Sequence, residues 1–274
     1  MKSIKLTRRR DDDQESEISI APGVTVGGKE LLIVAGPCSV ESEAQMNEVG
    51  SRLAHLPVTA YRGGAFKPRT SPYGFQGLGR EGLEILRKMR RTFGRPVITE
   101  AMSVEQARQV ATYADVIQIG SRNMQNFELL KALGEFDKPI LLKRGLAATM
   151  EEFLLAAEYI MNSGNSQVIL CERGIRSFDT NTRNVLDLGT VFSLKKHTHL
   201  PVLVDPSHAA GKRELVAPLA RAAIACGADG IMIETHPIPE KSVTDARQSL
   251  SLEEAAILVR SLEPIARSIG RILH

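Results

Sequence analysis

The sequence has no tryptophan, few aromatic residues and only three cysteines. Aromatic residues make up 4% of the chain, which excludes the rows of stacking side chains that bind single-stranded nucleic acid. Cys38, Cys171 and Cys226 are too few for a disulfide framework and indicate a reducing compartment, so we expect a cytoplasmic protein. No apolar run approaches the roughly 20 residues of a membrane span, and the charged N-terminus lacks the apolar core of a signal peptide.

The composition that remains is typical of a globular protein. Hydrophobic residues make up 43% and charged residues 24% of 274 residues, which suits one large domain with a full core. The formal net charge is only +3. Positive charge must therefore matter through its location, not its total.

From Glu30 onwards an apolar, β-rich run alternates with a loop and an amphipathic helical stretch. Near-continuous apolar strands alternating with helices predict a parallel sheet covered by helices. Eight such units in about 245 residues match the number and size of a (β/α)8 barrel, an α/β fold. An open doubly wound sheet is the alternative, but no G-x-G-x-x-G follows the first run. The runs are 31–38, 58–64, 96–102, 116–122, 139–145, 167–174, 201–208 and 230–237.

Helical stretches lie between and after these runs. Several open on the capping residues Ser42, Ser103, Asn126 and Thr149. We expect helices over 42–56, 81–93, 104–113, 127–136, 150–162, 185–197, 214–226 and 252–269.

The N-terminal part of the chain differs from this pattern. Residues 1–17 carry a basic run and then an acidic run, which predicts a flexible tail. Apolar residues in 18–29 alternate across Pro22-Gly23, which predicts a short hairpin at the bottom of the main domain. Residues 30–274 would then form the catalytic barrel.

Each apolar run ends in a chemically reactive side chain, and a barrel places its active site at these strand ends. Strand ends are polar in any barrel because they reach solvent, but that alternative predicts mixed Ser, Asn, Asp and Lys. It does not predict cations on four strands. The terminal residues are Cys38, Arg62, Glu100, Arg122, Lys143, Arg173, Asp205 with His208, and Glu234 with His236.

The cations are expected to converge on one mouth. Like charges in a cleft repel one another unless anions bind there, which favours a ligand with carboxylate and phosphate groups, or two phosphorylated ligands. Each cation alone could instead be a salt-bridge partner. The set is Arg62, Lys67, Arg122, Lys143 and Arg173.

The stretch 61–72, YRGGAFKPRTSP, concentrates this chemistry. The Gly63-Gly64 pair and Pro68 shape a loop that can hold a fork of positive charge for a phosphate or carboxylate. A solvated basic loop is the alternative. The side chains available for binding are Arg62, Lys67, Arg69, Thr70 and Ser71.

Soft and acidic groups follow the first, seventh and eighth runs, which are neighbours in a closed barrel. Cys38, His208 and Glu234, with Asp245 in the next loop, would make a four-ligand site for a divalent transition metal. A lone cysteine is more often core and a lone histidine more often a surface residue, so the convergence carries this interpretation. A thiolate also argues against magnesium or calcium.

The motifs resemble those of the type Iβ 3-deoxy-D-arabino-heptulosonate 7-phosphate (DAHP) synthases, and the similarity covers nearly all of 28–274. The resemblance implies a metal-dependent transferase that condenses phosphoenolpyruvate with erythrose 4-phosphate, the first step of the shikimate pathway. The implied metal is manganese, iron, cobalt or zinc. The motifs are GPCSVES (36–42), YRGGAFKPRTSPYGFQG (61–77), IGSRNMQNF (119–127), LLKRG (141–145), CERGIR (171–176), DPSHAAG (205–211) and IETHP (233–237).

The resemblance also implies residue roles. It assigns the metal to Cys38, His208, Glu234 and Asp245, and phosphoenolpyruvate to Arg62, Lys67, Arg122, Lys143 and Arg173. It assigns the phosphate of the sugar aldehyde to Arg69 and Thr70, with Ser71 nearby. Lys143 or His208 would handle a proton, Asp205 would orient its neighbours, and Glu100 would position water or balance the cations.

Two alternatives remain at this point. The related 3-deoxy-D-manno-octulosonate 8-phosphate synthases use arabinose 5-phosphate and typically carry Lys-Ala-Asn-Arg-Ser-Ser where this chain reads KPRTS from Lys67, which favours the tetrose. Some relatives replace the metal-binding cysteine with asparagine, so Cys38 predicts metal dependence. A non-catalytic anion-binding barrel would be expected to have lost a metal ligand or Lys67, and none is missing.

Regulation and assembly follow from the resemblance alone. Many type Iβ enzymes carry a ferredoxin-like or chorismate mutase domain, and residues 1–17 have room for neither, so we expect weak or no feedback inhibition. The family forms dimers and tetramers, so we expect a homo-oligomer. We expect no nucleic-acid or membrane partner.

Overall fold

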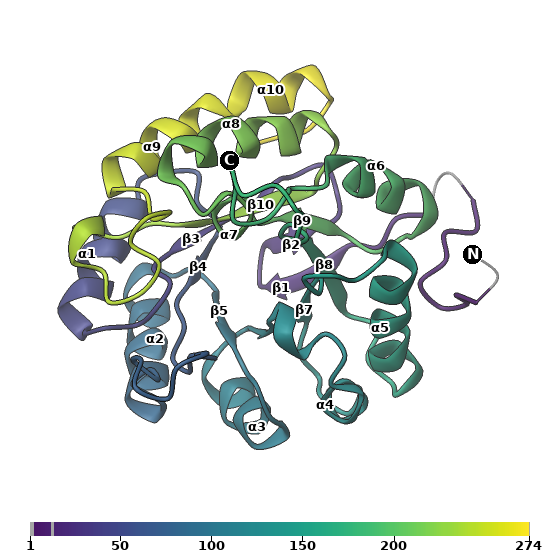
Figure 1. The fold of residues 1–274 in the computed structure, drawn as a ribbon, viewed down its shortest axis with the longest axis horizontal. Helices are drawn as coiled ribbons and strands as arrows, with labels where there is room; N and C mark the ends of the chain where they lie inside the picture. Colours follow the sequence, from purple (N-terminus) through teal and green to yellow (C-terminus); the bar gives the residue numbers. More distant parts are fainter. Residues whose placement is uncertain (1–2, 12–13, 274) are drawn as a thin grey trace.

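A computed structural model describes residues 3–11 and 14–273. Eight parallel strands close into a barrel in the order β10-β3-β4-β5-β6-β7-β8-β9, with helices around the outside (Figure 1). The predicted (β/α)8 barrel is therefore confirmed. The barrel strands are β3 (Leu32–Gly36), β4 (Ala60–Arg62), β5 (Val97–Glu100), β6 (Val116–Ile119), β7 (Ile140–Lys143), β8 (Val168–Glu172), β9 (Val202–Val204) and β10 (Gly230–Glu234).

Helices cover the outer face of the barrel. The Ser42, Ser103, Asn126 and Thr149 side chains each accept a hydrogen bond from a first-turn N–H, which confirms the predicted caps. The helices are α1 (Glu43–Leu53), α2 (Arg80–Phe93), α3 (Val104–Tyr113), α4 (Phe127–Leu133), α5 (Met150–Asn162), α6 (Leu188–His197), α7 (Pro206–Ala210), α8 (Arg213–Ala225), α9 (Leu252–Ser261) and α10 (Glu263–Ser268), with short 3-10 turns η1 (Ser121–Asn123) and η2 (Pro239–Lys241).

The last predicted helix, 252–269, is two helices in the structure. α9 ends at Ser261 and α10 begins at Glu263 with Pro264 in its first turn. Proline has no N–H to donate and its ring clashes with the preceding turn, so it ends one helix and suits the start of another. None of the helices in the described part of the chain is long and apolar enough to cross a membrane.

A small hairpin closes the N-terminal end of the barrel, as the sequence predicted. It consists of β1 (Ile18–Ala21) and β2 (Val24–Val26), which pair antiparallel. Ile18, Ile20 and Val26 pack with side chains of the barrel interior, such as Val34 and Leu203. Full burial of such a side chain contributes about 1.5–3 kcal/mol. The hairpin therefore leaves the opposite mouth as the open end of the barrel.

The described part of residues 1–17 lies against the barrel, whereas the sequence predicted a flexible tail. Ile4 is 3% exposed and Thr7 is fully buried. The Glu158 carboxylate on α5 accepts hydrogen bonds from the backbone N–H groups of Lys5, Leu6 and Thr7. The partner lies about 150 positions away in sequence, so the charge runs alone could not indicate this contact.

Candidate active site

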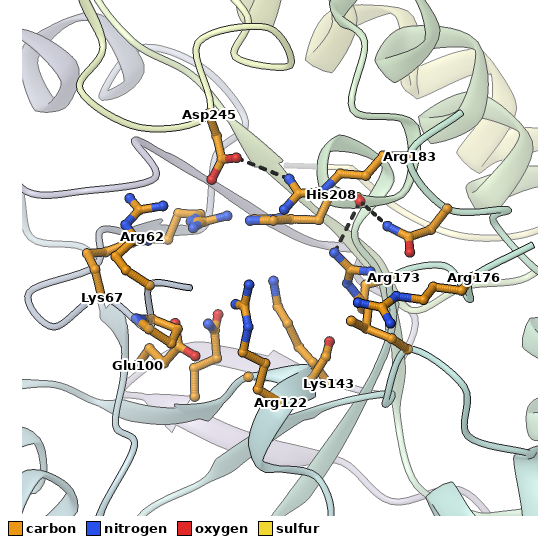
Figure 2. Close-up of a pocket in the computed structure, with 17 residues that line it drawn as sticks. Arg62, Lys67, Glu100, Arg122, Lys143, Arg173, Arg176, Arg183, His208 and Asp245 are labelled. Atoms are coloured by element: carbon orange, nitrogen blue, oxygen red, sulfur yellow. Dashed lines mark hydrogen bonds and ion pairs between the residues drawn. The ribbon is translucent and has the colours of Figure 1, made fainter. Parts of the chain in front are cut away.

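A cavity of about 250 Å³ opens at the C-terminal ends of the strands. Figure 2 shows basic side chains from several strand ends pointing into it. The six cations that the sequence placed at an anion site all line this cavity: Arg62, Lys67, Arg69, Arg122, Lys143 and Arg173. The structure thus brings together side chains that are up to 111 positions apart in sequence.

Strand geometry explains how these cations reach the cavity. Arg62 is the last residue of β4, Lys143 is the last residue of β7, and Arg173 follows β8 directly. Alternate side chains of a strand point to opposite faces, so each strand end sends one side chain inward. Arg62, Lys143 and Arg173 are at most 5% exposed. Burial lowers the pKa of Arg173, but a guanidinium stays charged at neutral pH.

Some buried side-chain atoms at this site have no hydrogen-bond partner. The structure described here contains four such side-chain atoms: Arg62 Nη1, Arg69 Nη2, Glu234 Oε1 and Thr235 Oγ1. Two of them are guanidinium nitrogens that belong to cavity-lining residues. An unsatisfied buried donor costs about 1–3 kcal/mol, so these two atoms indicate that an anion completes the site.

The four predicted metal ligands form a cluster beside the cavity. The ligand atoms of Cys38, His208, Glu234 and Asp245 all lie within 4.8 Å of one another. Cys38 Sγ lies 3.0 Å from Asp245 Oδ2, and His208 Nε2 lies 3.1 Å from Glu234 Oε1. Glu234 is fully buried, and its Oε1 also lies 3.3 Å from Arg62 Nη2. A sulfur, an imidazole and two carboxylates fit a divalent transition metal.

Asp245 reaches the cluster through an unusual backbone conformation. It has a φ of 53°, and among residues 3–11 and 14–273 it is the one non-glycine residue with positive φ. Aspartate tolerates this left-handed region better than most residues, although at some cost. The spacing of the sequence could not place this side chain, because the turn that directs it is a property of the folded loop.

Polar side chains hold the second oxygen of each carboxylate in the cluster. Gln248 Nε2 donates a hydrogen bond to Glu234 Oε2 at 2.7 Å. Arg183 Nη1 donates to Asp245 Oδ1 at 3.1 Å and to Gln248 Oε1 at 3.2 Å. One oxygen of each carboxylate therefore stays directed toward the cluster. Sequence reasoning missed both Arg183 and Gln248, which lie in loops outside the apolar runs.

His208 lies one short turn beyond β9, in α7, and not in the strand itself. Asp205 caps this helix, and its Oδ2 lies 2.7 Å from His208 Nδ1, which leaves Nε2 facing the cluster. Burial lowers the pKa of His208, but the Asp205 and Glu234 carboxylates outweigh it and raise the pKa to about 10. Asp205, despite its burial, keeps a pKa well below its ordinary range because His208 and Lys143 lie beside it.

Gly64 leaves room for the Lys67 side chain beside Cys38, just after β3. Lys67 Nζ donates to the Cys38 carbonyl oxygen at 2.8 Å and lies 3.0 Å from Cys38 Sγ. A Cβ on Gly64 would lie 2.7 Å from both that carbonyl oxygen and Lys67 Cδ. The Gly63-Gly64 pair of the sequence therefore has a steric role at Gly64.

The second half of the 61–72 loop is less enclosed. Arg69 lines the cavity, and its Nε donates to the Phe75 carbonyl oxygen at 3.2 Å. Thr70 and Ser71 are exposed and do not line the cavity in this structure. The Ser71 hydroxyl accepts a hydrogen bond from the Tyr73 N–H within the same turn.

Further cavity residues had not been singled out as binding residues. Arg176 and Arg183 come from the connection between β8 and α6, and Gln118 is in β6. Arg176 ends the CERGIR motif, so that motif could have indicated it. Glu100, expected at the end of β5, lines the cavity and lies over Gly120, where a Cβ would be 2.0 Å from Glu100 Oε1.

A parallel barrel whose mouth joins a cation-lined cavity to a Cys-His-Glu-Asp cluster defines a class of enzymes that act on anionic substrates. The chain belongs to the DAHP synthetase I family, which it matches over residues 12–267. This confirms the family that the motifs indicated.

Two kinds of relative match most of the chain, and they are named for different products. The chain is 51% identical over 270 residues to the phospho-2-dehydro-3-deoxyheptonate aldolase of Thermotoga maritima, covering 98% of this chain and 80% of that protein. It is 32% identical over 268 residues to the 2-dehydro-3-deoxyphosphooctonate aldolase of Geotalea daltonii, covering 91% and 97%.

Solved structures agree with this pattern. A crystal structure of the Thermotoga maritima phospho-2-dehydro-3-deoxyheptonate aldolase has a TM-score of 0.95 and 49% identity, covering 100% of this chain and 80% of that one. A truncated form of 3-deoxy-D-arabino-heptulosonate 7-phosphate synthase from the same organism has a TM-score of 0.91 and 47% identity, covering 98% of both chains.

Proposed function

We propose that this protein condenses phosphoenolpyruvate with erythrose 4-phosphate to DAHP and inorganic phosphate, as a metal-dependent transferase. The observation that carries the proposal is one cavity that holds two buried, unpaired guanidinium nitrogens next to a four-ligand metal cluster. The Thermotoga maritima relative, named for the same product, supports the choice of reaction.

In this proposal the cations bind phosphoenolpyruvate and hold it for attack. Its phosphate and carboxylate match Arg62, Lys67, Arg122, Lys143 and Arg173, which line the cavity together. Guanidinium groups bind such anions through paired hydrogen bonds. Both substrates are anionic, so these cations also offset the repulsion between them and fix their approach. Arg69, with Thr70 and Ser71 from the same loop, is assigned to the phosphate of erythrose 4-phosphate.

Cys38, His208, Glu234 and Asp245 would hold the divalent metal, which we propose to be manganese, iron, cobalt or zinc. A cation held there would act as a Lewis acid, either toward the aldehyde of the second substrate or toward the water that attacks phosphoenolpyruvate. Asp205 keeps the His208 ring in place through Nδ1, and Gln248 and Arg183 hold the outer oxygens of the carboxylates.

The reaction joins the methylene carbon of phosphoenolpyruvate to the aldehyde carbon of erythrose 4-phosphate. Water adds to the carbon that bears the phosphate. The bond between this carbon and the phosphate oxygen then breaks, which releases inorganic phosphate and leaves the keto acid. We propose that Lys143 or His208 transfers a proton in this reaction. Both side chains contact Asp205. Glu100 lines the same cavity and either orients the water or balances the cations.

The choice of erythrose 4-phosphate over arabinose 5-phosphate rests on the loop sequence Lys67-Pro-Arg-Thr-Ser71. The identities of 51% and 32% to relatives named for the two products point the same way. A non-catalytic barrel is disfavoured because Lys67 and all four residues of the metal cluster are present. We further propose a cytoplasmic homo-oligomer, a dimer or tetramer.

The proposal is tested by incubating the purified, metal-loaded chain with both substrates and following the products by NMR. We expect DAHP and inorganic phosphate in equal amounts, and no product after treatment with excess chelator. Phosphate release without DAHP, or full activity in chelator, would contradict the proposal.

A further inference from the structure

A buried, ion-paired cluster lies behind the cavity at the ends of β7 and β8. Arg144 Nη1 lies 2.8 Å from Glu172 Oε2 and 3.2 Å from Asp187 Oδ2. Arg144 is 3% exposed and Glu172 is fully buried. The cavity lining includes none of these three side chains, so the reaction proposed above does not use them.

The same strand ends carry two cations of the cavity. Lys143 precedes Arg144, and Arg173 follows Glu172. Since neighbouring side chains of a strand point to opposite faces, Lys143 and Arg173 enter the cavity while Arg144 and Glu172 face away from it. The outer pair therefore lies directly behind the inner pair.

Further hydrogen bonds tie this outer pair to the backbone around the two cations. Arg144 Nε donates to the Ala148 carbonyl oxygen at 2.9 Å, and its N–H donates to the Cys171 carbonyl oxygen at 3.0 Å. The Gly174 N–H, immediately after Arg173, donates to Glu172 Oε1 at 2.6 Å. The backbone after Lys143 and on both sides of Arg173 is thus held.

The third member connects this pair to a helix. Asp187 caps α6 by accepting hydrogen bonds from the Thr190 N–H at 2.8 Å and the Thr190 hydroxyl at 2.6 Å. Arg144 therefore joins the ends of two strands to the start of a helix, with a planar group that fixes several partners at once.

Stability alone is a weak reason for such a cluster. Replacing a buried ion pair by apolar side chains of similar volume is often neutral or stabilising, because desolvation offsets the attraction. We propose that Arg144 and Glu172 are positioning residues, which hold Lys143 and Arg173 at the spacing that phosphoenolpyruvate requires. This inference rests on the proposed function, because it takes phosphoenolpyruvate as the ligand of these cations.

The test measures phosphoenolpyruvate binding by calorimetry with the full chain and with the double variant Arg144→Met/Glu172→Met. The double variant leaves no unpaired charge in the buried pair, so we expect its Tm to stay close to that of the unmodified chain. Its Kd for phosphoenolpyruvate should rise about tenfold or more, since small misplacements of binding groups carry large costs. Its affinity for Zn²⁺ should stay within about twofold, because neither residue contacts the metal cluster.

Two further variants complete the design. Arg90→Met breaks an ion pair with Asp115 that is 2.8 Å long and distant from the cavity, and should change the Tm without changing phosphoenolpyruvate binding. Arg144→Lys keeps the charge but loses the planar guanidinium group. If the double variant does not fold, this variant tests whether Arg144 positions the two cations. We expect Arg144→Lys to weaken phosphoenolpyruvate binding several-fold.

The outcomes separate the two proposals. A double variant or Arg144→Lys that binds phosphoenolpyruvate as the unmodified chain does would overturn this inference and leave the proposed function intact. If the unmodified chain binds no phosphoenolpyruvate, the proposed function fails and this inference fails with it.

Discussion

The ammonium nitrogen of Lys67 lies 3.0 Å from the sulfur of Cys38. Lys67 lines the anion cavity, and Cys38 belongs to the metal-ligand cluster. The cavity and the cluster are therefore parts of one site. We expect a substitution in either of them to change ligand binding at the other.

Cys38→Ala is expected to lose both the metal and turnover while the barrel stays folded. The substitution removes one of four ligands, and the side chain is small enough for the core to tolerate its loss. Metal content of the purified variant, its circular dichroism and its turnover are the measurements. Cys226→Ala is the matched control, because Cys226 is not part of the metal cluster. In the described chain its Sγ has one hydrogen-bond partner, the Leu188 carbonyl oxygen. A fully active, metal-loaded Cys38→Ala protein would refute the ligand assignment.

Metal affinity is expected to rise with pH. In the metal-free protein the Asp205 and Glu234 carboxylates overcome the effect of burial and hold the pKa of His208 at about 10, and this proton must leave before Nε2 can bind a metal. Each pH unit below about 10 should therefore cost about tenfold in affinity through His208 alone. Competition titrations against a chromophoric chelator at pH 6, 7 and 8 measure this slope. An affinity that does not change with pH would contradict the arrangement.

The stability of the metal-free protein should move in the opposite direction. The pKa of His208 is raised above its ordinary value of about 6.5, so its contribution is complete below that pH and is lost as pH rises toward about 10. Urea unfolding of metal-free protein at pH 6, 8 and 10 checks the sign. Asp205→Asn should weaken this dependence, because it removes one of the two carboxylates that hold the proton.

Arg69→Ala and Arg122→Ala are expected to affect different substrates. Arg69 lies in the loop after β4, and its unpaired Nη2 is assigned to the phosphate of erythrose 4-phosphate. Its loss should raise the KM for erythrose 4-phosphate about tenfold or more, since charged hydrogen bonds contribute about 1.5–3 kcal/mol. Arg122→Ala should mainly raise the KM for phosphoenolpyruvate. Equal effects of each variant on both substrates would refute the division of the cavity.

The barrel and most of the site could be predicted because they depend on local patterns. Each apolar run fixes a strand, and barrel closure then brings the strand ends together, so Arg62, Lys143 and Glu234 meet without further information. Cys38 and His208 follow from the same logic, since they come after β3 and β9, the two strands that pair with β10 on either side.

Other features depend on long-range contacts that carry no local pattern. The conformation of Asp245, the hydrogen bonds of Arg183 and Gln248, and the docking of the N-terminal residues on Glu158 all arise between loops or helices. The break before Pro264 was visible in the sequence, but the apolar periodicity on both sides favoured one continuous helix.

The central claim is that this one site uses erythrose 4-phosphate and depends on a metal. The most direct measurement is the rate of phosphoenolpyruvate consumption by the purified chain with erythrose 4-phosphate and, separately, with arabinose 5-phosphate, each with and without excess chelator. The account predicts turnover with erythrose 4-phosphate only, lost in chelator and restored by manganese, iron, cobalt or zinc. Preferential use of arabinose 5-phosphate, or turnover that persists in excess chelator, would contradict it.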